Sequence, residues 1–362
     1  MKKQILTFLL ILFMSMIGAK AFAYDIAVEN AEGVTIYYNY INNGLELEVT
    51  YLEGIYSENR NTYIGAIEIP EEVTYMNRTR KVTSIGTAAF AGCGDLTSLT
   101  IPNSITTIGK HAFYSCAFTS FIIPSNVTSI GKGAFMYCTQ MKNVTIPKSI
   151  TDIGGGAFYM TESLTSVHIS SIEAWCKIQF DIHAVGTNPL FYAHHLFLNG
   201  EEVKDVVIPN SITTINDGVF EGCSELSSVT IPDGVTLIGV SSFHGCKSLT
   251  SITLPNNVTS IGSGAFADCS SLESINIPNN VTNIGAGAFS GCEALTSINI
   301  PENITEIKSS TFYYCKSLTS ITLPNSLITI GLQAFGDCSG LTSINIPNGV
   351  TTIDQFAFQN CI

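Results

Sequence analysis

The stretch LTSITLPNNVTSIGSGAFADC, from Leu249 to Cys269, returns from Leu272 to Cys292 as LESINIPNNVTNIGAGAFSGC. The same phrase recurs, with variations, over most of the chain. Prolines stand at one constant interval, at positions 209, 232, 255, 278, 301, 324 and 347, and an x-A-F phrase or its variant occurs eleven times. A fixed period of this length is typical of repeat proteins, in which each unit stacks on its neighbours.

The apolar residues of one unit fit neither a single helix nor a single long strand. Residues 249–254 predict a short strand that Pro255 ends, and residues 258–261 predict a second extended segment. Gly262 then predicts a position free to take a positive φ before the chain turns back. A unit this short cannot bury its own apolar face, so we expect stacked coils with parallel strands about 4.8 Å apart.

The repeats predict a right-handed, curved solenoid of about eleven 23-residue coils, mostly β with short turns or 3₁₀ segments. Repeats occupy residues 82–169 and 209–362. Residues 24–81 read as a few strands and predict an N-terminal β cap, which would cover the apolar edge of the first coil.

The unit L-x-x-I-x-I-P-x-x-V-x-x-I-G-x-x-A-F-x-x-C resembles the repeat of BspA-like leucine-rich-repeat proteins, a bacterial cell-surface and secreted family. The resemblance covers about residues 82–169 and 205–362, and IEIPEEVTYMNRTRKVTSIG (67–86) resembles the lead-in to such arrays. It implies a curved solenoid used for adhesion to host or matrix proteins, and it implies no catalytic residue.

Residues 1–23 predict an export signal. Lys2 and Lys3 precede an apolar stretch at 5–17, and residues 21–23 give an A-x-A cleavage pattern. The stretch is too short for a stable membrane span, and no later apolar run is long enough to be one. We therefore expect an exported protein at the cell surface or in the extracellular space, with the periplasm as the alternative.

The balance of charge argues against two classes of partner. The formal net charge is −13, and removal of Lys2, Lys3 and Lys20 with the signal leaves −16. Such a chain repels phosphate backbones and anionic lipid headgroups, so neither nucleic acid nor bare membrane is an expected partner.

Ten of the eleven cysteines recur at one position of the repeat. Side chains at one position of a stack point in nearly parallel directions, which disfavours disulfide geometry. We therefore predict a packing ladder of small buried side chains. Its members are Cys93, Cys116, Cys138, Cys223, Cys246, Cys269, Cys292, Cys315, Cys338 and Cys361.

The rhythm breaks between Pro147 and Pro209, which sets residues 170–208 apart as an insertion. A metal site is one hypothesis for this insertion, because residues of types that bind metal ions gather there. Their spacing does not match a recognised zinc motif. These residues are Cys176, Asp181, His183, His194 and His195. The alternative is a loop or extended coil without a ligand, packed by Trp175, Phe180, Phe191 and Phe197.

In the first predicted strand of each unit, which corresponds to residues 249–254, one side chain should point outward. These positions predict a nearly uncharged binding stripe. Its members are Thr100, Thr145, Thr230, Thr253, Asn276, Asn299, Thr322 and Asn345, and Ile122 and Val207 interrupt it. Stacked hydroxyls and amides suit many modest contacts with an extended partner rather than a small-molecule pocket.

The sequence therefore predicts a non-catalytic adhesion or ligand-binding protein without a cofactor, whose partner is an extracellular protein or glycan. The carboxylates are scattered, and no nucleophile elbow or dinucleotide fingerprint is present. A structural envelope or matrix scaffold without a specific ligand is the alternative, and a metal-dependent activity in residues 170–208 is another. The last coil ends at Cys361-Ile362 without a closing cap, which predicts that its edge could form a homodimer.

Overall fold

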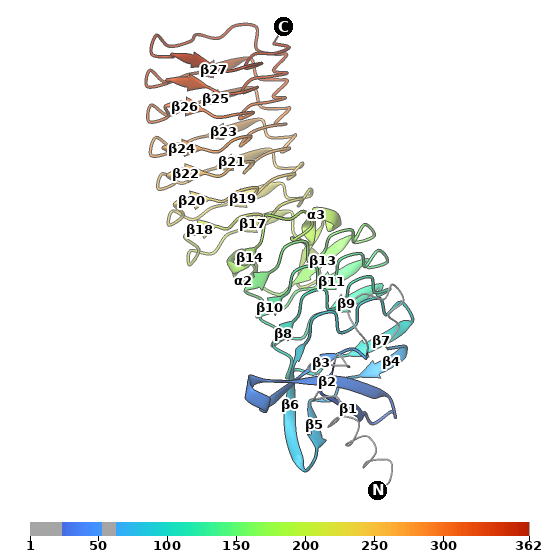
Figure 1. Ribbon diagram of the computed structural model, residues 1–362. Coiled ribbons are helices and arrows are strands. Elements are labelled where there is room, and N and C mark those ends of the chain that lie inside the picture. The colour runs from blue at the N-terminus through green and yellow to red at the C-terminus, as the bar shows by residue number, and fades with distance from the viewer. Residues whose placement is uncertain (1–23, 53–62, 362) are drawn as a thin grey trace.

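The computed structural model describes residues 24–52 and 63–361. These residues form a β-solenoid of about twelve stacked coils of about 23 residues, with almost no helix (Figure 1). The predicted repeat solenoid is therefore confirmed. The segment 1–23, predicted to be an export signal, lies outside the described residues.

Each regular coil contributes a first strand from its LTSIT-like segment. Most first strands of successive coils pair in parallel without a shift, as in the pairing of Ile252 with Ile275. Within the described ranges, the strands at 96–100 and 120–122, and those at 274–276 and 297–299, are not paired with each other. The first strands are β7 (Leu96–Thr100), β9 (Ser120–Ile122), β11 (Asn143–Thr145), β13 (Ser166–Ile169), β17 (Asp205–Val207), β19 (Ser228–Thr230), β21 (Ser251–Thr253), β23 (Ser274–Asn276), β25 (Ser297–Asn299) and β27 (Ser320–Thr322).

A second, two-residue strand follows after the proline turn of the same coil. Its isoleucine is buried in most coils, while the residue before it faces outward, as expected for a strand with one buried face. The second strands are β8 (Thr107–Ile108), β10 (Ser129–Ile130), β12 (Asp152–Ile153), β18 (Thr214–Ile215), β20 (Leu237–Ile238), β22 (Ser260–Ile261), β24 (Asn283–Ile284), β26 (Glu306–Ile307), β28 (Thr329–Ile330) and β29 (Thr352–Ile353).

The N-terminal segment extends the sheet of second strands. Its elements are β1 (Ile26–Glu29), β2 (Thr35–Ile41), the 3₁₀ turn η1 (Asn42–Gly44), β3 (Glu46–Thr50), β4 (Gly65–Glu68), β5 (Glu72–Tyr75) and β6 (Arg78–Ile85). Strand β6 pairs with β3 on one side and with β8 on the other, both in parallel. It spans the predicted boundary at residues 81 and 82, so the segment and the first coil share one sheet.

Residues 170–208 form an enlarged coil with two short helices. The coil holds α2 (Ile172–Lys177), β14 (Gln179–Phe180), α3 (Leu190–Ala193), β15 (Leu196–Leu198) and β16 (Glu201–Glu202). The Ser171 hydroxyl caps α2 by accepting a hydrogen bond from the Ala174 amide. The expectation of a loop or extended coil is therefore wrong at α2 and α3, whereas β14 and β15 continue the sheets through β12 and β13.

This enlarged coil joins two stacks, which are offset from each other at α2 and α3 (Figure 1). We call residues 82–169 the N-terminal stack and residues 205–361 the C-terminal stack. The Trp175 indole donates a hydrogen bond to the Val219 carbonyl at 2.9 Å, and the Asn188 amide donates to the Gly218 carbonyl at 2.6 Å. Both donors are buried, so the junction is held by satisfied polar contacts as well as apolar packing.

A ladder of stacked phenylalanine rings runs through the core of each stack. Neighbouring ring centroids lie 5.2–5.6 Å apart within a stack, and the planes are nearly parallel. The amide of each ladder phenylalanine also donates to the next coil, as Phe266 does to the Ala288 carbonyl at 2.8 Å. At the junction, Phe158 donates instead to Gly186, where no ring continues the ladder.

The cysteines lie beside this ladder, and all of them are free thiols. Each regular ladder thiol donates to the phenylalanine carbonyl of the preceding coil, as Cys269 does to Phe243 at 3.2 Å. That carbonyl also accepts the amide hydrogen bond of Cys246 in its own coil. Thr161, which replaces cysteine, donates its hydroxyl to Phe158 within its own coil at 2.7 Å.

The recurring glycine has a different role from the one predicted. Gly262 does not have a positive φ; the left-handed position lies two residues later, at Gly264, where φ is 59°. A Cβ on Gly262 would lie 2.5 Å from the Val240 amide nitrogen of the preceding coil. Glycine is favoured here because the backbones of neighbouring coils approach closely, although Asn216, Lys308 and Asp354 take this position in three coils.

Truncating one ring of the ladder should destabilise the whole C-terminal stack. We expect Phe266→Ala to lower the free energy of unfolding by about 3–5 kcal/mol, because it leaves a cavity between two stacked rings. Chemical denaturation followed by circular dichroism measures this change. Phe356→Ala is the control, since this ring is 58% exposed. Equal losses in the two variants would contradict a core role for the ladder.

The buried thiols predict a loss of stability in alkaline solution. Burial raises the pKa of Cys138, Cys223 and Cys269 to about 12, whereas a thiol in an unfolded chain ionises near about 8.5. Between about pH 8.5 and about pH 12, the thiols lose their protons in the unfolded state but keep them in the folded state. The free energy of unfolding should therefore fall as pH rises through this range. Urea midpoints at about pH 8 and about pH 10 measure the fall. The double variant Cys138→Ala, Cys269→Ala should show a smaller fall, and an unchanged fall would rule the thiols out as its source.

Candidate binding surface

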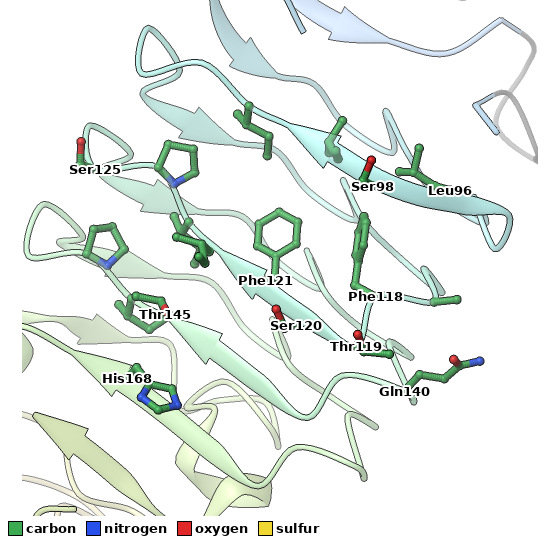
Figure 2. Close-up of a pocket in the computed structure, with 18 of the residues that line it drawn as sticks. Leu96, Ser98, Phe118, Thr119, Ser120, Phe121, Ser125, Gln140, Thr145 and His168 are labelled. Carbon is green, nitrogen blue, oxygen red and sulfur yellow. The ribbon is translucent and has the colours of Figure 1, made fainter. Parts of the chain in front are cut away.

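An open groove of about 1520 Å³ crosses the first strands of the N-terminal stack (Figure 2). Strands β7, β9, β11 and β13 contribute its wall and floor, and Asn199 and Gly200 also line it. Its lining mixes apolar side chains with hydroxyls and amides, among them Phe118, Phe121, Ile122, Ser120, Thr145 and Gln140.

The groove lies at a seam between two sheets. Strand β7 pairs with β4 and β9 pairs with β11, and among the described residues no strand pairing joins β7 to β9. The coil at this point is one residue shorter, because Ala117 alone separates Cys116 from Phe118 where two residues separate Cys269 from Leu272. The shortened coil and its bulkier side chains account for the separation of the strands.

Two phenylalanines fill the floor of the seam in place of the usual leucine and isoleucine. Phe118 and Phe121 contact each other with centroids 5.1 Å apart, and Phe121 also packs on Phe113 of the core ladder at 4.9 Å. Both side chains are buried. The floor of the groove is thus continuous with the core and held in place by it.

A row of outward side chains crosses the strands beside the groove. In register, Ile122 is opposite Thr145, Thr145 is opposite His168, and His168 is opposite Phe197. Ile122 is 73% exposed. The His168 and Phe197 rings stack with centroids 4.9 Å apart, and His168 Nε2 lies 3.0 Å from the Ser166 hydroxyl.

Two members of this row were missed in the sequence. LTSVHIS (164–170) aligns with LTSITLP (249–255), so His168 occupies the stripe position of Thr253 and could have been assigned to the row. Phe197 carries no such signal, because residues 170–208 do not follow the repeat. Its register becomes visible only through the pairing of β15 with β13.

In the C-terminal stack the stripe is uncharged and regular. Val207, Thr230, Thr253 and Asn276 are opposite one another on successive strands. Of the predicted stripe, Thr145 is half-buried and the other seven residues are exposed, namely Thr100, Thr230, Thr253, Asn276, Asn299, Thr322 and Asn345.

The structure does not gather the metal-ligand candidates of residues 170–208 into one site. Cys176 is buried in α2, His183 is exposed, and His194 bonds through Nδ1 to the Gly222 carbonyl at 3.1 Å. His195 bonds to Glu202 at 2.5 Å. Within residues 24–52 and 63–361, no group of three or more histidine, cysteine or acidic side chains is placed to hold a metal ion.

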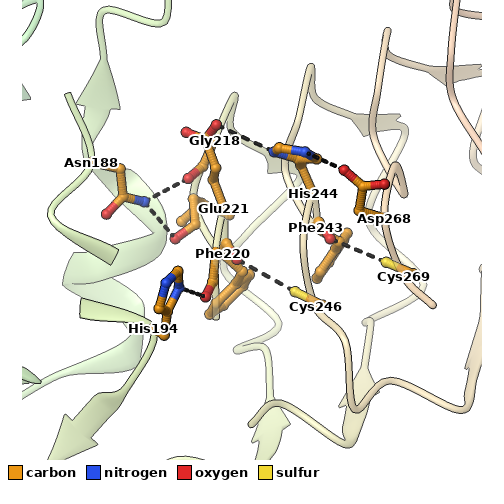
Figure 3. A network of polar contacts seen from close by, with 12 residues as sticks. Asn188, His194, Gly218, Phe220, Glu221, Phe243, His244, Cys246, Asp268 and Cys269 are labelled. Atoms are coloured by element: carbon orange, nitrogen blue, oxygen red, sulfur yellow. Dashed lines mark hydrogen bonds and ion pairs between the residues drawn. The ribbon is translucent and has the colours of Figure 1, made fainter. Parts of the chain in front are cut away.

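An acidic network surrounds one histidine on the turn side of the C-terminal stack (Figure 3). His244 lies between two carboxylates of neighbouring coils, with Glu221 3.5 Å from Nδ1 and Asp268 3.2 Å from Nε2. The hydrogen bond with Glu221 raises the pKa of His244 most, burial opposes it, and Asp268 raises it further. The network is an ion-paired surface cluster.

The comparisons with known proteins agree with this geometry. A family model described as a BspA type leucine rich repeat region, in six copies, matches residues 66–181, 193–319 and 305–362. None of the curated proteins matches the chain. In the part of the chain that the structure describes, no helix is long and apolar enough to span a membrane.

Several solved bacterial proteins have a similar structure. A leucine rich cell surface protein from Faecalibacterium prausnitzii is 28% identical with a TM-score of 0.57, and 93% of each chain is covered. A leucine-rich repeat protein from Bacteroides ovatus is 25% identical with a TM-score of 0.50, covering 94% of this chain and 93% of the other. One from Eubacterium ventriosum is 24% identical with a TM-score of 0.59, covering 93% and 96%, and shows a shared fold.

The His244 network predicts a contribution to stability that depends on pH. A histidine whose pKa is raised in the folded state stabilises the fold below its unfolded pKa of about 6.5, and this contribution is lost as pH rises through the folded value. We expect His244→Gln to lower the urea midpoint more at about pH 5 than at about pH 8. His183→Gln, at an exposed histidine outside the network, is the control. A pH-independent effect of His244→Gln would show that its charge does not contribute.

Proposed function

The chain belongs to the BspA-type leucine-rich-repeat family, and we propose that it is an exported, non-catalytic surface protein that binds an extracellular protein or glycan. A cell-surface location is supported by the family and by the similar Faecalibacterium prausnitzii structure, which is a leucine rich cell surface protein. Retention at the surface and adhesion are parts of this proposal.

The groove over β7, β9, β11 and β13 is the observation that carries the proposal. It is open and about 1520 Å³ in volume, larger than the enclosed pockets of about 300–1,000 Å³ that hold small molecules. Its residues come from four successive coils, so a ligand that fills it must be extended. A segment of a protein or a glycan chain has that shape.

The lining favours a polypeptide over a glycan in this groove. Ile122 is a large exposed aliphatic side chain on one side of Thr145, and the His168 ring, which stacks on Phe197, lies on the other side. Apolar and aromatic anchors surrounded by hydrogen-bonding groups are typical of protein interfaces. The hydroxyls of Ser98, Ser120 and Thr145 offer hydrogen bonds around these anchors (Figure 2).

The chemistry of the groove supports a role without catalysis. Ser166 and His168 are within hydrogen-bond distance. Among the described residues, however, no carboxylate is hydrogen-bonded to the other ring nitrogen of His168, which is stacked on Phe197. A serine–histidine pair in a hydrolase needs a third group to orient the imidazole. The second candidate function, a scaffold without a specific ligand, has no observation of its own in its favour.

Blocking the groove should abolish ligand binding without disturbing the fold. We expect Ile122→Arg to weaken binding to the ligand found in a panel of extracellular-matrix proteins by about tenfold or more, because a charged side chain would cover the apolar surface. Biolayer interferometry on the full chain measures the affinity.

Val207→Arg is the matched control. Val207 is 71% exposed at the same position of a first strand in the C-terminal stack, so its change should leave the affinity within about twofold. Equal weakening by both substitutions would place the ligand elsewhere. Absence of saturable binding to every member of the panel would favour the scaffold.

A further inference from the structure

Residues 78–148, which run from β6 into the N-terminal stack, form a cationic segment in an otherwise acidic protein. Residues 78–148 contain seven lysines and arginines and a single acidic residue, a net charge of +6. Residues 149–362 contain five basic and 18 acidic residues, a net charge of −13. Arg78, Arg80 and Lys81 lie in β6. The other four basic residues, Lys110, Lys132, Lys142 and Lys148, lie on coils of the N-terminal stack, and the repeat itself does not require lysine at these positions.

Two of these lysines lie side by side at the turn that follows the second strand. Lys110 and Lys132 come directly after the glycine at which successive coils touch, and a Cβ on Gly131 would be 2.6 Å from the Lys110 amide. Both lysines are exposed. Within the described residues, neither forms an ion pair with an acidic side chain.

A run of aromatic rings continues from these lysines along the same turn. The His111 ring reaches over Gly133 of the next coil and lies 5.7 Å from the Tyr114 ring. Tyr114 and Tyr137 follow at 5.4 Å, and Tyr137 and Tyr159 at 6.0 Å. We call Lys110, His111, Tyr114, Lys132, Tyr137 and Tyr159 the Lys–Tyr surface.

The rings of this surface are partly exposed. Tyr137 is 39% exposed, and Tyr114 and Tyr159 are half-buried. Burial lowers the pKa of His111, and the neighbouring Lys110 and Lys132 lower it further, so this ring is neutral at neutral pH. The matching positions of the C-terminal stack are mixed. They include Glu221 and Asp268, the two carboxylates on His244 (Figure 3), and also Tyr313 and Tyr314, where the neighbouring Lys316 is paired with Glu293.

We propose that the Lys–Tyr surface is a second binding site, separate from the groove, for a repeating acidic sugar chain. Lysine ammonium groups would pair with its carboxylates or sulfates, and tyrosine rings would pack on the apolar faces of its sugar rings while their hydroxyls bond sugar hydroxyls. A linear polymer repeats its anionic groups and rings as the stack repeats its coils. Single-stranded nucleic acid is the competing polyanion, and its binding relative to the acidic sugars is one outcome of the test.

The experiment measures binding of the full chain to immobilised alginate and heparin, with neutral dextran, polyglutamate and single-stranded DNA as comparison probes. We expect binding to alginate, to heparin or to both, no binding to dextran, and weaker binding at about 150 mM than at about 50 mM salt. Preference for alginate would identify carboxylated sugars as the ligand class, and preference for heparin would identify sulfated ones.

The double variant Lys110→Gln, Lys132→Gln should weaken this binding by about fivefold or more. The matched control is Lys142→Gln, Lys148→Gln, at two exposed lysines of the same stack that lie outside the surface. It removes the same charge and should leave affinity within about twofold. Ile122→Arg should also leave sugar binding unchanged, which separates this site from the groove.

Three results would overturn the proposal. They are equal losses in the two lysine double variants, tighter binding to polyglutamate or to single-stranded nucleic acid than to either acidic sugar, and no binding to alginate or heparin at low salt. If the groove failed to bind any matrix protein, the proposal for the Lys–Tyr surface would still stand, because its test uses different probes and different substituted residues.

Discussion

The hydrogen bond from each ladder phenylalanine to the next coil is the contact on which the structure depends. A single coil has too little apolar surface to fold alone, so every coil is completed by its neighbours. The Phe266 amide bonds to Ala288, its ring stacks on Phe243 and Phe289, and the Cys269 thiol bonds back to Phe243. Polar and apolar contacts repeat with the same spacing, which keeps successive coils in register without disulfides.

Because the core is fixed in this way, the main structural differences between coils lie where the repeat departs from its own pattern. One residue is missing after Cys116, and the strands there separate into the groove. Residues 170–208 replace a regular coil with α2 and α3 and hold the two stacks together through Trp175 and Asn188. The regular C-terminal coils keep an exposed, uncharged row of Thr and Asn.

The repetition made much of the fold predictable from the sequence. The period, both strands of the coil, the buried cysteines and the outward position of Thr253 all follow from matching units. The sequence could not show that Gly262 is required by the close approach of another coil, because φ and spacing are not visible in a pattern. Nor could it place Phe197 beside His168 or open the seam at β9, since both depend on how irregular coils pair across the stack.

The most direct test of this account is hydrogen–deuterium exchange mass spectrometry on the free full chain. If the phenylalanine ladder and the enlarged coil hold both stacks as one unit, peptides containing Phe113, Trp175 and Phe266 should share slow exchange, with protection decreasing toward the last coil. Rapid exchange of residues 172–193 beside two protected stacks would contradict the account, because it would show that the stacks fold independently and that the enlarged coil is only a linker.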